Sequence, residues 1–133
     1  MKNLLILSLL VSSLSFAQAT APVSPIFDSL KTTMRDMSKK LKTIAAQVND
    51  PTKNADSEKL ALELAKSTAD AKLHIPASAA DKAGQDLFVH MIDGVVQSAN
   101  DLAAAFHEND NAKAITILNT MSQQKKDGHA RFD

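Results

Sequence analysis

Two side chains that could bind a metal lie far apart in the sequence but at corresponding ends of two helical patterns. Met34 lies in the apolar pattern of a helix predicted near the start of the chain, and His129 continues the pattern of the last predicted helix. In a four-helix bundle the first and last helices can be neighbours, so that a thioether and an imidazole face each other across one end of the core. Methionine and histidine are a known pair of axial ligands for haem iron. The spacing therefore predicts a haem site between these two helices.

Apolar residues recur at intervals of three and four along four segments, which is the pattern of helices packed in a bundle. The first segment is predicted to begin at Pro25, with Ser24 as N-cap, and to end before Pro51. Its apolar positions are Phe27, Leu30, Met34, Met37, Leu41, Ile44 and Val48. The third segment is predicted to begin near Ser78 or Ala79. Its apolar positions are Phe88, Ile92, Val95, Ala99, Leu102 and Phe106.

The second and fourth segments have weaker patterns. After a polar loop over residues 52–55, the second is predicted to begin at a Ser57 or Asp56 cap and to end near His74. Its inward positions are Leu60, Ala61, Leu64, Ala65, Thr68 and Ala71. The fourth is predicted to begin at about Asn111. Its inward positions are Ala114, Ile115, Leu118, Met121 and Ser122, continued at the same spacing by Lys125, His129 and Phe132.

Short connections, few turn-forming residues and the lack of any strand pattern indicate the fold class. The chain of 133 residues has 3 glycines and 4 prolines. We therefore predict an all-α fold, in which residues 20–133 form one antiparallel up-down-up-down four-helix bundle.

Residues 1–19 have the pattern of a signal peptide. Lys2 gives a positive start, an apolar run follows over residues 4–16, and Ala17-Gln18-Ala19 fits a cleavage site. The run is too short and too rich in serine for a membrane span, so we expect cleavage after Ala19 and no membrane attachment afterwards. Such a short signal is typical of bacteria and predicts the periplasm. The chain has no cysteine and hence no disulfide.

Charge and composition argue against several function classes. The chain has 15 basic and 15 acidic residues without a basic stripe, so nucleic acid is not an expected partner. It has no nucleophile–histidine arrangement and no glycine-rich phosphate loop, so we do not expect an enzyme. Its 4 histidines are not spaced as a zinc site. We expect a monomer, in which Lys39, Lys40 and Lys42 could guide an acidic redox partner.

Three positions carry a resemblance to a known family. The segment from Met34 to Ile44, MRDMSKKLKTI, is similar to an early segment of the soluble periplasmic cytochrome b562 family, with its Met followed by Leu-Lys-x-Ile. Phe88 lies where that family has a phenylalanine packed on haem, and His129 lies four residues before the last residue, as the family's ligand does. The resemblance covers residues 28–133. It implies one non-covalent haem b, with Met34 and His129 as axial ligands and Phe88 in contact with the macrocycle.

The segment before His129 departs from the family pattern. Lys125 replaces the arginine that family members commonly have four residues before the histidine, and it can pair with a haem propionate only as a point charge. Gly128 lowers helix stability beside the implied ligand. Related c-type cytochromes attach haem through Cys-x-x-Cys-His. Because Lys125 and Gly128 occupy the two cysteine positions, covalent attachment is excluded there.

Two filled axial positions would leave no open iron position for oxygen or peroxide. The expected function is therefore that of a periplasmic b-type cytochrome, which transfers single electrons with a periplasmic redox partner. Each ligand also has an ordinary interpretation, since such a methionine is usually core and such a histidine usually favours the helix dipole. One alternative is a haem-free periplasmic helical bundle acting as a binding, stress or metal-sensing protein. Another is a copper or zinc site of Met34, Met37 and His129, which would favour Cu(I).

Overall fold

The structure, a computed structural model, describes residues 25–133, with side chains described from residue 29. Its helices are α1 (Pro25–Gln47), the 3-10 helix η1 (Pro51–Lys53), α2 (Asn54–Ala71), α3 (Lys82–His107) and α4 (Asn111–Phe132). Within residues 25–133 there is no strand, and the predicted all-α fold with four α-helices is confirmed. The predicted signal peptide, residues 1–19, and the Ser24 cap lie outside the described residues.

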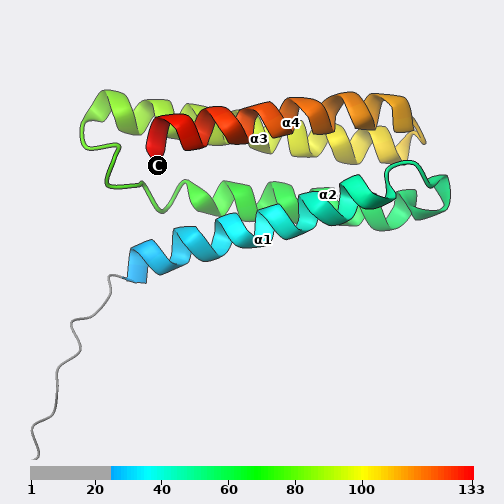
Figure 1. The fold of residues 1–133 in the computed structure, drawn as a ribbon, viewed down its shortest axis with the longest axis horizontal. Coiled ribbons are helices and arrows are strands. Elements are labelled where there is room, and N and C mark those ends of the chain that lie inside the picture. The colour runs from blue at the N-terminus through cyan, green and yellow to red at the C-terminus, as the bar shows by residue number, and fades with distance from the viewer. Residues whose placement is uncertain (1–24) are drawn as a thin grey trace, which may run out of the picture.

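Helices that follow one another in the chain pack side by side. The main contacts are those of α2 with α3, α3 with α4 and α1 with α2, whereas α1 and α4 touch each other little. Figure 1 shows the α1–α2 and α3–α4 connections at one end of the bundle. The α2–α3 connection, the start of α1 and the end of α4 lie at the other end. The fold is thus a four-helix bundle whose loosest contact is between α1 and α4.

The core follows the predicted apolar positions of α1, α2 and α3. Buried residues at these positions include Met37, Ile44, Ala61, Leu64, Ala65, Phe88, Ile92, Ala99, Leu102 and Phe106. They form two clusters, a larger one around Phe106 and Leu102 and a smaller one that contains Phe88 and Ile92. Met34 packs against both clusters, so the predicted ligand lies where the two parts of the core meet. No helix in the described part of the chain is long and apolar enough to cross a membrane.

Three asparagines, here called the asparagine clamp, join the two connections at one end of the bundle. Asn54 Nδ2 donates to Asn109 Oδ1 (3.0 Å) and to Asn111 Oδ1 (2.9 Å). Asn111 Nδ2 in turn donates to the Val48 carbonyl (2.6 Å) and to Asn54 Oδ1 (2.9 Å). Asn109 has a left-handed backbone (φ 57°), which asparagine tolerates better than most residues. The clamp therefore fixes the start of α2 against the start of α4.

The start of α2 differs from the prediction. The 3-10 helix η1 begins at Pro51 and leads directly into α2 at Asn54, so the two helices take the place of the predicted polar loop. Asp56 lies in the first turn of α2, so neither it nor Ser57 caps the helix. Ser57 is buried inside α2, and its Oγ accepts a hydrogen bond from Gln47 Nε2 (2.8 Å). The residue expected as a cap thus joins α2 to α1.

The start of α3 is also later than predicted. α3 begins at Lys82 rather than near Ser78 or Ala79. Asp81 is its N-cap, and Asp81 Oδ1 accepts a hydrogen bond from the Gly84 amide (2.7 Å). A carboxylate cap satisfies an otherwise unpaired amide of the first turn, which explains why the helix starts there.

α4 turns a different face to the core than the prediction gave it. Ala114 and Met121 are buried as predicted, but Ile115 and Ser122 are exposed, and Ile117 packs against the core instead. Ile115 and Ser122 are seven residues apart and so share one edge of the predicted face, and that edge is turned to solvent. The buried face of α4 therefore lies to one side of the predicted one.

Candidate functional site

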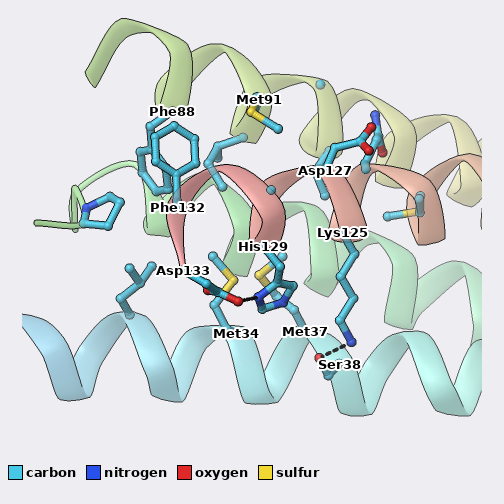
Figure 2. Close-up of a pocket in the computed structure, with 18 of the residues that line it drawn as sticks. Met34, Met37, Ser38, Phe88, Met91, Lys125, Asp127, His129, Phe132 and Asp133 are labelled. Carbon is cyan, nitrogen blue, oxygen red and sulfur yellow. Dashed lines mark hydrogen bonds and ion pairs between the residues drawn. The ribbon is translucent and has the colours of Figure 1, made fainter. Parts of the chain in front are cut away.

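A pocket of about 380 Å³ lies between α1, α3 and α4, in the half of the bundle that contains the end of α4. Its walls are mostly apolar, and it is partly open to solvent (Figure 2). Small-molecule sites in proteins have volumes of roughly 300–1,000 Å³, so this pocket is large enough for a cofactor or part of one. It lies along the loosely packed side of the bundle, between α1 and α4.

All four residues predicted to bind haem line this one pocket. Met34 comes from α1, Phe88 from α3, and Lys125 and His129 from α4. Met34 is half-buried and Phe88 is buried, whereas Lys125 and His129 are exposed. The structure thus brings together residues that lie up to 95 positions apart in the chain (129 − 34).

His129 lies on the edge of α4 that faces α1. Figure 2 shows its ring between the two helices, on the side of α4 that faces Met34 and Met37, which line the same pocket. Its side chain is 49% exposed, so it is more open to solvent than an inward position would be. His129 Nδ1 is hydrogen-bonded to Asp133 Oδ2 (2.5 Å). With Nδ1–H donating to this carboxylate, Nε2 keeps a free lone pair for a metal.

Asp133 was missed by the sequence analysis. It lies one helical turn after His129, at the i,i+4 spacing at which side chains on a helix meet. A carboxylate that holds one imidazole nitrogen is the usual partner of a metal-binding histidine. The spacing of these two residues could therefore have predicted the pair.

Every methionine that the structure describes lines the pocket. Met34 and Met37 come from α1, Met91 from α3 and Met121 from α4. Met37 and Met121 are buried, being 8% and 1% exposed. Of these, only Met34 and Met37 were predicted from the sequence as possible ligands. The pocket thus has soft thioether groups on all three of its helices.

Lys125 joins α4 to α1 beside the pocket. Its Nζ donates a hydrogen bond to Ser38 Oγ (3.2 Å), as Figure 2 shows. The ammonium group is exposed, so it can exchange this neutral partner for an anion without leaving the pocket edge. An acidic group of a ligand could be paired at this edge.

Two phenylalanines pack together at the end of the pocket. The rings of Phe88 and Phe132 are in edge contact, with centroids 5.4 Å apart and planes at 88°, which is a favoured aromatic geometry. Ser78 Oγ donates to the Phe132 carbonyl (2.7 Å), which ties the α2–α3 connection to the end of α4. This end of the pocket is therefore closed by aromatic rings and held by a backbone contact.

Gly94 on α3 and Gly128 on α4 both line the pocket. A Cβ at Gly128 would have no atom within 4 Å, and one at Gly94 would be 3.5 Å from Gln124 Nε2. Neither glycine is therefore required for close packing. Gln124 also lines the pocket, and its Oε1 is buried without a hydrogen-bond partner. The two glycines leave space in the pocket, and Gln124 provides a hydrogen-bond acceptor that has no partner.

His90 also lines the pocket, although the sequence analysis gave it no role. It is exposed on α3. The other two histidines pair elsewhere, His74 Nε2 with Ser29 Oγ (3.2 Å) and His107 Nδ1 with Glu58 Oε1 (3.2 Å). His129 and His90 are thus the imidazoles of the pocket. No group of three or more His, Cys, Asp or Glu residues that could hold a metal occurs among residues 25–133.

Asp36 lies on α1 one residue before Met37. Its Oδ2 accepts hydrogen bonds from Lys40 Nζ and from Ser67 Oγ (3.3 Å), which joins α1 to α2. The hydrogen bond from Lys40 is the main reason why the pKa of Asp36 is below its ordinary value. The helix that carries the methionines is therefore held on its far side by an ionised carboxylate.

Comparisons with protein-family models, with curated proteins and with solved structures gave no match to this chain.

Proposed function

We propose that the protein is a b-type cytochrome that binds one non-covalent haem b, with Met34 and His129 as axial ligands, and transfers single electrons. The observation that supports this proposal is that Met34, Phe88, Lys125 and His129 line one pocket. The proposal includes an antiparallel up-down-up-down topology, export to the periplasm after removal of residues 1–19, a monomeric state and a redox partner there.

The donor set of the pocket fits a haem. One wall offers a thioether on α1 and the facing edge offers an imidazole on α4, which are ligands that haem iron accepts. Phe88 and Ile92 provide a buried apolar surface for a flat macrocycle. Lys125 at the pocket edge could pair with a propionate. The two glycines of the pocket leave space that side chains would otherwise fill.

The residues of the chain have separate roles in this proposal. Asp133 orients the imidazole through Nδ1 and keeps Nε2 free. Phe88 excludes water from the deep end, because it is 4% exposed and packed on Phe132. Haem supplies the one-electron chemistry when bound, and a thioether ligand favours its ferrous form.

A haem titration of the protein without residues 1–19 tests this proposal. We expect a saturable one-to-one change in the Soret band and low-spin α and β bands after reduction. Met34→Leu and His129→Ala should abolish the low-spin spectrum, while His107→Ala, which changes a histidine outside the pocket, should leave it unchanged. A flat titration of folded, helical protein would reject the proposal and favour the alternative of a haem-free periplasmic bundle.

A further inference from the structure

The pocket is unusual in the chemistry of its donors. Four thioethers line it on three helices, and His129 offers a nitrogen whose opposite ring atom is already held by Asp133. Thioethers bind soft metal ions and bind hard divalent ions poorly. A haem uses only one of these sulfur atoms, so it leaves the clustering of the others unexplained.

Three of these donors come from the two helices that face each other across the pocket, α1 and α4. Met34 and Met37 are one helical turn apart on α1, which places their side chains on the same face. Figure 2 shows both sulfur atoms on the side of α1 that faces the His129 ring, and all three residues line the pocket. We propose that Met34 Sδ, Met37 Sδ and His129 Nε2 form a binding site for a soft monovalent metal ion, Cu(I), without a macrocycle.

Charge also favours a monovalent ion. The three donors are neutral and the surrounding wall is mostly apolar, so an ion bound there keeps its full charge in a poorly solvating environment. This penalty is smaller for Cu(I) than for a divalent ion. The charged groups of the pocket are Asp133, hydrogen-bonded to His129, Asp127, and Lys125, which is hydrogen-bonded to Ser38. The nearest charge to the imidazole is therefore negative, and it favours a cation at Nε2.

This site needs no haem, and it competes with haem for two of its donors. Both ligands need Met34 and His129, so a chain can hold one of them at a time. Met37 separates the two, because the metal site needs a second thioether and the axial pair does not. Met37→Leu is close to volume-conserving and so should preserve the bundle, which circular dichroism can verify.

The test measures Cu(I) binding by competition with a chromogenic Cu(I) chelator under anaerobic, reducing conditions. Ag(I), which is equally soft but has no competing oxidation state, serves as a second probe. We expect one Cu(I) per chain and a loss of affinity of roughly tenfold or more in Met37→Leu and in His129→Ala. His107→Ala and His90→Ala are the controls and should bind as the unchanged protein does.

X-ray absorption at the copper edge identifies the donors directly. We expect sulfur and nitrogen in the first shell, with less sulfur in Met37→Leu. A shell of nitrogen and oxygen alone would overturn the site, as would equal affinity in Met37→Leu and the unchanged protein. Loss of binding in His90→Ala but not in His129→Ala would also overturn it.

The failure of this site can be distinguished from the failure of haem binding. Met37→Leu should retain the low-spin haem spectrum while it loses Cu(I). Gly128→Leu places a side chain in open space of the pocket and should block a macrocycle while the three metal donors remain. If Gly128→Leu does not fold, the smaller Gly128→Ala replaces it. Haem binding without Cu(I) binding would reject only the metal site.

Discussion

At the scale of single residues, the chemistry of the pocket depends on which nitrogen of His129 is free. Asp133 fixes this, because its carboxylate can accept a hydrogen bond from Nδ1 but cannot donate one while ionised. Removing the carboxylate would let either nitrogen carry the proton. The imidazole would then be present in the binding form for only part of the time.

We therefore expect Asp133→Ala to shift His129 towards a mixture of tautomers, which nitrogen NMR of the ligand-free protein would detect. Haem affinity should fall by roughly 10- to 100-fold, the range for partners of metal-binding histidines. Asp127→Asn is the matched control, since Asp127 also lines the pocket but is hydrogen-bonded to Gln123. An equal effect of the control would show that only the charge of the pocket matters.

The unpaired side-chain oxygen of Gln124 should lower the stability of the ligand-free protein. A buried acceptor without a partner lowers stability by roughly 1–3 kcal/mol, and Gln124 Oε1 is such an atom. Gln124→Leu should therefore raise the free energy of unfolding of the ligand-free protein by about 1 kcal/mol, measured by urea denaturation. The exposed neighbour Gln123 should give no gain when changed to Leu. A loss of stability in Gln124→Leu would mean that the amide has a partner in solution.

Sequence spacing predicted some of these residues and missed others for a physical reason. Met34 and Phe88 repeat with the apolar pattern, so their places on the helix faces followed from it. Asp133, Gln124 and His90 are polar residues in or beside such a pattern, where polarity alone indicates solvent exposure. Only the neighbouring helices determine that these side chains reach a pocket.

At the scale of elements, the helices could be predicted better than their ends. The apolar intervals located α1 and α3 well, because burial of one face dominates helix packing. The starts of α2 and α3 depend on single hydrogen bonds, such as that from the Gly84 amide to Asp81, and several nearby residues could have made them. The face of α4 was misjudged because its exposure depends on the neighbouring helices: Ile117 packs against the core, whereas Ile115 and Ser122 on the opposite edge are exposed. Lys125 and His129 are exposed because α1 packs only loosely against this part of α4.

Gly128 gives a prediction that concerns the whole of α4. Alanine stabilises a helix interior by about 1 kcal/mol relative to glycine, and a Cβ at this position would meet nothing within 4 Å. Gly128→Ala should therefore raise the thermal midpoint of the ligand-free protein. It should also weaken haem binding, because the methyl group occupies pocket space. Gly94→Ala is the comparison on α3, and a gain of stability with unchanged haem affinity would show that Gly128 does not limit the pocket.

A substitution in the asparagine clamp should lower stability, in contrast to Gly128→Ala. Asn111→Ala removes the hydrogen bonds to Val48 and Asn54 and leaves partly buried groups unpaired. We expect a loss of about 1–3 kcal/mol in the free energy of unfolding, with haem affinity unchanged because the pocket lies in the other half of the bundle. Asn119→Ala, on an exposed surface of α4, should have little effect. Weaker haem binding in Asn111→Ala would show that the two ends are coupled.

At the scale of the whole molecule, the pocket lies where the bundle is packed least. α1 and α4 touch little, and the larger core cluster lies away from the end of α4. A ligand that contacts both helices would supply the missing contact. Four helices in a bundle followed from the sequence, but this unequal packing did not, because it depends on the sizes of facing side chains.

Haem binding should therefore protect the chain unevenly. Amide hydrogen exchange should slow in the first half of α1 and the second half of α4, and change little near the asparagine clamp. At a haem concentration about 100 times the dissociation constant, binding raises the free energy of unfolding by about 2.7 kcal/mol. The slowing of amide exchange should correspond to a free energy of this size. Uniform slowing along all four helices, measured by mass spectrometry, would contradict binding at the α1–α4 contact.

The asparagine clamp fixes the C-terminal end of α1, so that any rotation of this helix around that end displaces its N-terminal half the most. Met34 precedes Val48 by 14 residues, so that at 1.5 Å per residue it lies about 21 Å along the helix axis from the fixed end. A rotation of α1 by about 10° around that end would carry Met34 through about 4 Å, by the same helix geometry, while Val48 hardly moves. A change in pocket width by the thickness of a flat ligand would thus leave the asparagine clamp intact, but it would have to move Asp36 away from Ser67, whose hydrogen bond joins α1 to α2.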